Sequence, residues 1–296
     1  MDYSSAASPT TRTRSPMVAT SWLADRLTAT GLVLVDASVL PPIPGGDGYP
    51  LSGRGDYFVE GHIPGAVFAD MIKVFSDQDG EYPFHAPGVD AFEDAAGSLG
   101  IDNSSTVVIY DNQQGQWAAR LWWLFRTFGY DRVGVLDGGI TKWRSENRPI
   151  QTGYVAPIDA TFVASPRPDL WADRAYLEAI VAGELEAALV CGLPRDEYLG
   201  ATGGRSRGGH IPGSISAPNA DMIDPETNEL ISSPELTKML SGALPYDRVV
   251  VYCGGGIASA LDALALTMLG HRNVAIYDNS MMEWATHDDL PLVSVG

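Results

Sequence analysis

The chain has 296 residues, 45% of them hydrophobic, and a formal net charge of −18. This length suggests about two domains, with enough apolar residues for sizeable cores. The acidic balance argues against nucleic acids and anionic membranes as partners, because both are bound through basic patches.

The chain contains two cysteines, Cys191 and Cys253. They form neither a Cys-x-x-Cys pair nor a cluster with metal-ligand spacing, so we expect no metal site. So few cysteines also argue against a disulfide scaffold and favour the reducing cytoplasm as the compartment. Because the sequence has no run of 18 apolar residues, no membrane-spanning helix is predicted.

In chain order, residues 1–16 lack the apolar core of a secretory signal, and we expect this N-terminal segment to be disordered. Apolar runs and helical spacing then predict a helix over 21–27, strands over 32–36, 106–110 and 133–136, and a helix over 117–128. The Pro- and Gly-rich stretch over 40–54 is predicted to be a loop.

The second half of the chain repeats the order of motifs found in the first. A His-Ile-Pro-Gly motif begins at His62 and again at His210, and a strand that ends in Tyr110-Asp111 is echoed by one that ends in Tyr252-Cys253. Recurrence in both halves favours a structural role for the two histidines.

This repeat predicts an α/β fold with two tandem domains, each a parallel sheet with helices on both faces. We place the domains at 17–150 and 169–296, joined by a Pro-rich linker over 151–168. A ligand pocket is expected between them.

The most informative stretch of the sequence surrounds Cys253. Four residues typical of a strand run into this cysteine, three glycines follow, and apolar residues then recur at helical spacing. The pattern predicts a strand, a tight loop and a helix, with inward N–H groups that favour a thiolate. An inert buried cysteine is the alternative. A phosphate site is disfavoured, because the loop lacks a Lys-Ser/Thr end and has Ser259 where Cys-x5-Arg phosphatases need arginine.

The tandem His-Ile-Pro-Gly motifs, the Tyr-Asp-Asn loop at 110–112 and the Tyr-Cys-Gly-x-Gly loop at 252–256 resemble the two-domain sulfurtransferases of the rhodanese superfamily. The resemblance covers about residues 18–290. It implies tandem rhodanese-like domains, a catalytic Cys253 in the second, and a non-catalytic first domain, whose Asp111 cannot carry a sulfur. It also implies that a sulfane sulfur moves from thiosulfate or 3-mercaptopyruvate, through a persulfide on Cys253, to cyanide or a thiol, without a separate cofactor.

The same resemblance assigns a cradle for the anionic sulfur to five backbone N–H groups. They belong to Gly254, Gly255, Gly256, Ile257 and Ala258. The loop carries no side-chain charge, which favours the mercaptopyruvate branch of the family. Gly255, however, replaces a serine that is usual in that branch.

Other positions depart from the family pattern. Leu193 stands where the family has an arginine that binds the substrate anion. We expect Arg207 first and Arg205 second to bind the substrate instead, with solvated loop arginines as the alternative. His85 is expected to line the pocket, but Ile72 stands where the acidic partner of that histidine is found.

Two further questions stay open at this point. Cys191 is either a small buried side chain or a relay and disulfide partner for Cys253. Loss of the arginine at Leu193 leaves an alternative to an efficient enzyme: a low-turnover persulfide carrier or a sulfur-responsive binding protein.

Overall fold

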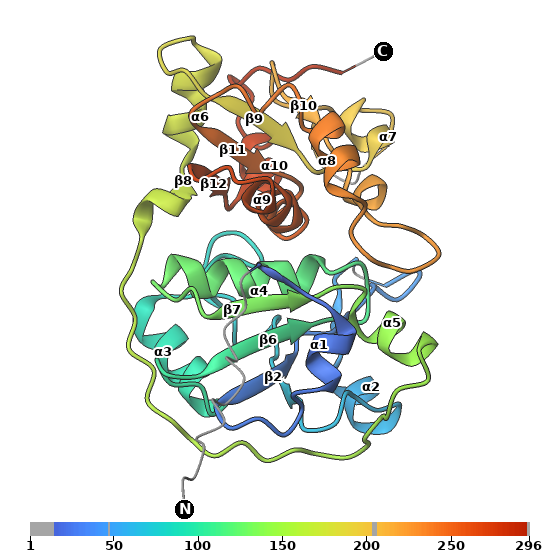
Figure 1. Cartoon of the computed structure of the whole chain (residues 1–296). Coiled ribbons are helices and arrows are strands. Elements are labelled where there is room, and N and C mark those ends of the chain that lie inside the picture. The colour runs from blue at the N-terminus through green and yellow to red at the C-terminus, as the bar shows by residue number, and fades with distance from the viewer. Residues whose placement is uncertain (1–14, 47, 203–205, 295–296) are drawn as a thin grey trace, which may run out of the picture.

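The computed structural model describes residues 15–46, 48–202 and 206–294 (Figure 1). The N-terminal segment expected to be disordered lies almost wholly outside these residues. Two α/β domains follow each other along the chain, each built on a five-stranded sheet in which every pairing is parallel. No helix in the described residues is long and apolar enough to cross a membrane.

The first sheet has the strand order β1-β7-β6-β2-β5. Its strands are β1 (Met17–Val18), β2 (Leu32–Asp36), β5 (Val67–Phe68), β6 (Thr106–Tyr110) and β7 (Val133–Leu136), and β3 (Val39–Leu40) pairs with β4 (Leu51–Ser52) beside them. Its helices are α1 (Thr20–Ala24), α2 (Arg54–Val59), α3 (Val89–Ser98), α4 (Gln116–Thr127) and α5 (Gly139–Ser145).

The second sheet, in the order β10-β9-β11-β12-β8, repeats this topology strand for strand. Its strands are β8 (Trp171–Ala172), β9 (Ala188–Cys191), β10 (Ile215–Ser216), β11 (Val249–Tyr252) and β12 (Val274–Tyr277). Its helices are α6 (Arg174–Val181), α7 (Arg195–Tyr198), α8 (Ser233–Met239), α9 (Ser259–Met268) and α10 (Ser280–Trp284), with short 3-10 turns η1 (Pro168–Leu170) and η2 (Asn219–Met222).

Helices cover both faces of each sheet, as the sequence predicts. Successive residues of a strand alternate between the faces, so Val107 and Ile109 of β6 join one apolar cluster and Val108 and Tyr110 join another. The larger cluster continues from β6 through α4 and α9 to β11 without a break. Helices α4 and α9 pack against each other where the two domains meet (Figure 1).

The segment between the domains forms no helix or strand over residues 152–167 and runs along the first domain (Figure 1). It is anchored there by Phe162, which is buried among aromatic side chains of the first domain, including Phe92, Phe125 and Tyr130. The N–H of Ala160 also donates to the Gly97 carbonyl (2.9 Å).

Both His-Ile-Pro-Gly motifs are structural in the same way. The rings of His62 and His210 stack on Tyr57 and Tyr198, with centroids 3.9 Å and 3.6 Å apart. The amide after each histidine then donates to the hydroxyl of a strand tyrosine: Ile63 to Tyr110 (3.1 Å) and Ile211 to Tyr252 (2.9 Å).

Asp111, at the end of β6, shows what the strand-to-helix turn of this fold binds. Its buried carboxylate accepts four backbone hydrogen bonds, from Gln113 (2.8 Å) and Gly115 (3.1 Å) on one oxygen and from Trp117 and Ala118 (3.0 Å each) on the other. Burial raises the pKa of Asp111, and these hydrogen bonds oppose that rise. The turn is therefore an anion site whose anion, in this domain, is part of the chain.

Replacing Asp111 by alanine should destabilise the fold, because four N–H groups, two of them buried, would lose their acceptor. We expect a loss of roughly 2–4 kcal/mol in the free energy of unfolding, measured by urea denaturation. The control is Asp102→Ala, which removes a carboxylate that accepts similar bonds from Ser104 and Ser105 in a solvent-facing turn. Equal losses for the two variants would contradict this role of Asp111.

Candidate active site

Cys253 occupies in the second domain the place that Asp111 has in the first. It follows β11 at the carboxyl end of the sheet, and its side chain is 2% exposed. The N-terminal part of α10 holds the loop: the Cys253 N–H donates to Ser280 Oγ (3.1 Å), and the Cys253 and Gly254 carbonyls accept from the N–H groups of Met281 (3.1 Å) and Met282 (2.9 Å).

The amides of the following loop have the freedom that an anion cradle needs. In the described part of the chain, the N–H groups from Gly254 to Ala258 donate to no protein acceptor. Gly256 turns the loop with a φ of +76°, and a Cβ at this position would lie 2.4 Å from the Asp278 carbonyl oxygen. Only glycine fits such a close approach without strain.

A cavity of about 290 Å³ opens over Cys253 between the domains, as the sequence predicts. Phe84 and Trp117 of the first domain form part of its wall, with their rings edge to face and 5.6 Å apart. The second domain contributes Gly192, Leu193, Pro194, Glu197, Met282 and the Cys253 loop, and Gln116 completes the lining. Glu197 and Cys253 are the ionisable side chains among these described residues.

Arg207, which the sequence predicts to bind the substrate, is not among the described residues that line this cavity. Its guanidinium donates to the carbonyl oxygens of His287 (2.5 Å) and Leu290 (2.7 Å) and so holds the C-terminal segment in place. Arg205 lies outside the described residues.

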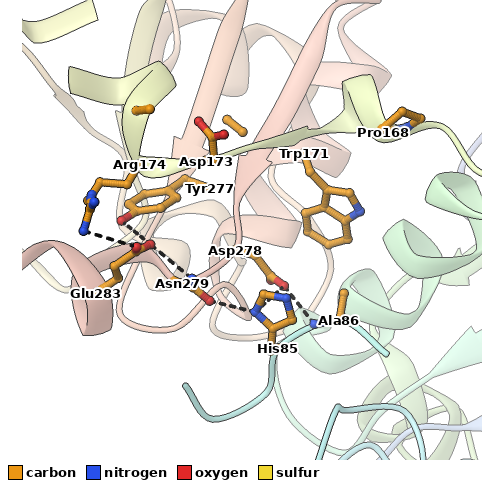
Figure 2. A pocket seen from close by; sticks show the side chains of 12 residues that line it. His85, Ala86, Pro168, Trp171, Asp173, Arg174, Tyr277, Asp278, Asn279 and Glu283 are labelled. Atoms are coloured by element: carbon orange, nitrogen blue, oxygen red, sulfur yellow. Dashed lines mark hydrogen bonds and ion pairs between the residues drawn. The ribbon is translucent and has the colours of Figure 1, made fainter. Parts of the chain in front are cut away.

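His85, which the sequence predicts to line the substrate pocket, is not among the described residues that line this cavity, and its neighbour Phe84 is. Phe84 adopts a φ of +64° and lines the cavity over Cys253. His85 points into a separate cavity of about 560 Å³ (Figure 2). There the His85 Nδ1 lies 2.8 Å from Asn279 Oδ1 and 3.8 Å from Asp278 Oδ2. The sequence carries no sign of which of two adjacent side chains faces the thiol.

Cys191 behaves as a small core residue. It is fully buried at the end of β9, paired with Tyr252, and burial raises the pKa of its thiol to about 12. Both Cys191 and Cys253 are free thiols in this structure. These observations favour the buried alternative over a relay or a disulfide.

Sequence reasoning missed Asp262, a fully buried carboxyl on α9. Neither of its oxygens has a hydrogen-bond partner in the described chain, and a Cβ on Gly192 would lie 2.3 Å from its Oδ2. Burial, with a smaller contribution from the charge of Cys253, raises the pKa of Asp262 well above its ordinary value, which favours the protonated carboxyl. The sequence signal for this residue is a single carboxyl side chain within an otherwise apolar predicted helix.

Two glycine substitutions in the loop should distinguish the effect of backbone strain on Cys253 from the effect of an added methyl group. Gly256→Ala forces an unfavourable φ against a backbone carbonyl, which costs about 1–3 kcal/mol of strain. We expect iodoacetamide to alkylate Cys253 roughly tenfold more slowly in this variant. In Gly255→Ala the new Cβ meets only the flexible Met282 Sδ (2.9 Å), so the rate should stay near that of the wild type. Equal rates in both variants would contradict the need for the turn at Gly256.

Asp262→Asn should change the pH dependence of stability. The folded chain retains a proton on Asp262 that the unfolded chain releases above about pH 4. This contribution is complete below that pH and is lost as the pH rises toward the folded-state pKa. As the pH rises above about 5, the wild type should therefore lose stability more steeply than the variant, by up to about 1.4 kcal/mol per pH unit. Urea unfolding at several pH values measures this, and parallel slopes would contradict it.

Comparison with known proteins agrees with this geometry. The rhodanese-like domain family matches residues 19–146 and 190–287. The 3-mercaptopyruvate sulfurtransferase of Escherichia coli K12 is 30% identical over 94% of this chain and 98% of its own length. The human 3-mercaptopyruvate sulfurtransferase and the bovine thiosulfate sulfurtransferase are each 34% identical over 90% of this chain and 91% of theirs.

Among solved structures, SseA from Escherichia coli superposes with a TM-score of 0.79 at 27% sequence identity, covering 90% of this chain and 98% of SseA. The Tum1 protein of Saccharomyces cerevisiae, at 21% identity and a TM-score of 0.81, shares the fold. With both halves matched and full-length relatives at 30% identity or more, the chain belongs to the rhodanese family and is a two-domain sulfurtransferase.

Proposed function

We propose that this sulfurtransferase carries the transferred sulfur as a persulfide on Cys253, held by the backbone N–H groups of Gly254, Gly255, Gly256, Ile257 and Ala258. The observation that carries the proposal is the internal repeat. At the same turn of the first domain a carboxylate accepts four amide hydrogen bonds, so the turn is built to bind an anion. A thiolate or a persulfide anion is the corresponding charge in the second domain.

The reaction proceeds in two displacement steps. The Cys253 thiolate attacks the sulfane sulfur, a new S–S bond forms, and the donor bond breaks. Its electron pair leaves with sulfite from thiosulfate, or with the enolate of pyruvate, which takes a proton, from 3-mercaptopyruvate. A thiol or cyanide acceptor then attacks the outer sulfur, and the electron pair of the broken S–S bond returns to Cys253.

Of the two donors, we favour 3-mercaptopyruvate, which appears in the names of several relatives. The described lining of the cavity holds Glu197 and no lysine or arginine, so a dianion such as thiosulfate is less well accommodated than a monocarboxylate. A low-turnover persulfide carrier is the second candidate, because Leu193 on the same wall supplies no cation. No separate cofactor is needed, and we propose the cytoplasm as the compartment.

Cys253→Ser should abolish both turnover and the mass increase of one sulfur atom after incubation with donor, because the hydroxyl is a far weaker nucleophile. Steady-state assays with each donor and cyanide, combined with intact-mass measurement, test this. Cys191→Ala is the control and should keep activity within about twofold, because it removes the other thiol without placing a hydroxyl in the apolar core. Persulfide formation without turnover in the wild type would favour the carrier, and turnover by Cys253→Ser would exclude the proposed mechanism.

A further inference from the structure

A buried arginine of the non-catalytic domain contacts the catalytic loop of the other domain. Arg120 lies on α4, and its side chain is 1% exposed. Its guanidinium forms an ion pair with Asp278 Oδ1 (2.6 Å) and donates to the carbonyl oxygens of Phe84 (2.8 Å) and Gly256 (3.3 Å). The guanidinium carbon also lies 5.2 Å from the centre of the Trp171 ring.

Two of these partners belong to segments that line the cavity over Cys253, and the other two, Asp278 and Trp171, line the neighbouring cavity of about 560 Å³. Gly256 is the turn of the sulfur loop, and Phe84 is a wall of the cavity. Asp278 follows β12, and its second oxygen accepts from the Ala86 N–H (2.8 Å; Figure 2). Arg120 and Asp278 thus join one segment of the first domain to two segments of the second.

The contact with Gly256 fixes a peptide plane. In a trans peptide the C=O of one residue and the N–H of the next point in opposite directions. Holding the Gly256 carbonyl on the guanidinium therefore turns the Ile257 N–H to the other side of the loop. That N–H is one of the groups assigned to the cradle of the sulfur anion.

We propose that Arg120 is a positioning residue, which keeps the 256–257 peptide in the orientation that lets the loop bind a sulfur anion. The inference rests on the proposed function and extends it: the first domain supplies a support for the catalytic loop as well as a wall of the cavity. Arginine suits this task because its planar guanidinium meets several acceptors at fixed angles, whereas lysine offers a single charged point. Burial of the charge is tolerated because Asp278 pairs with it.

The test compares Arg120→Met and Arg120→Lys with Arg126→Met and Arg126→Lys. Arg126 lies on the same helix and also crosses to the second domain, where it donates to Thr267 Oγ1 of α9 (3.2 Å), away from the sulfur loop. For each variant we would measure the free energy of unfolding, the pH midpoint of Cys253 alkylation by iodoacetamide, and kcat and KM for 3-mercaptopyruvate.

We expect both Arg120 variants to shift the alkylation midpoint to higher pH and to lower kcat by about tenfold or more, a part of the roughly 10²–10³-fold loss that follows when one donor to a reacting anion is removed outright. The Arg126 variants should lose stability without moving the midpoint. An unchanged midpoint and kcat in Arg120→Lys would overturn the proposal, even if Arg120→Met fails to fold. The alkylation midpoint needs no sulfur donor, so it decides the role of Arg120 even if the wild type turns over neither donor.

Discussion

The N–H groups at the start of a helix are the constraint on which this structure depends. Helices α4 and α9 each follow a buried parallel strand after a short turn, and the amides of such a turn and of the first helical residues favour a negative partner. The first domain meets this need with the carboxylate of Asp111. The second domain places the thiol of Cys253 at the corresponding turn, beside backbone N–H groups that donate to no acceptor in the described chain.

Duplication of the fold gave the two copies different tasks. The sheets share one topology, and both keep the stacked histidine motif that orients the strand tyrosine. The first copy, with a carboxylate built into its turn, contributes side chains to the site of the second: Phe84 and Trp117 on the cavity wall and Arg120 behind the sulfur loop. The site therefore requires both copies, although the proposed nucleophile belongs to one.

The sequence predicted the features that depend on local pattern. Strands over 32–36, 106–110 and 133–136 have the predicted bounds, since buried parallel strands are continuous apolar runs. The internal repeat and the strand, loop and helix around Cys253 were also predicted from the sequence. Which side chains meet in the cavity was not predictable. Which of the adjacent side chains Phe84 and His85 lines the cavity depends on the positive φ of Phe84. The hydrogen-bond partners of Arg207 and Arg120 come from segments that are distant in sequence.

Asp262 shows a different limit of sequence reasoning. A single acidic residue on a buried helix is no motif, and its effect on the neighbouring Gly192 emerges only when β9 and α9 are brought together. Its orphaned oxygens give the interior beneath the sulfur loop a polar character that hydrophobic patterning does not reveal.

The apolar layer that runs unbroken from β6 through α4 and α9 to β11 has a consequence for access to the thiol. Separation of the two domains would expose this apolar layer to water, at a large cost in free energy. Hinge opening is therefore a poor route for exchanging reactants. Reactants therefore reach Cys253 through the cavity of about 290 Å³ that already lies over it.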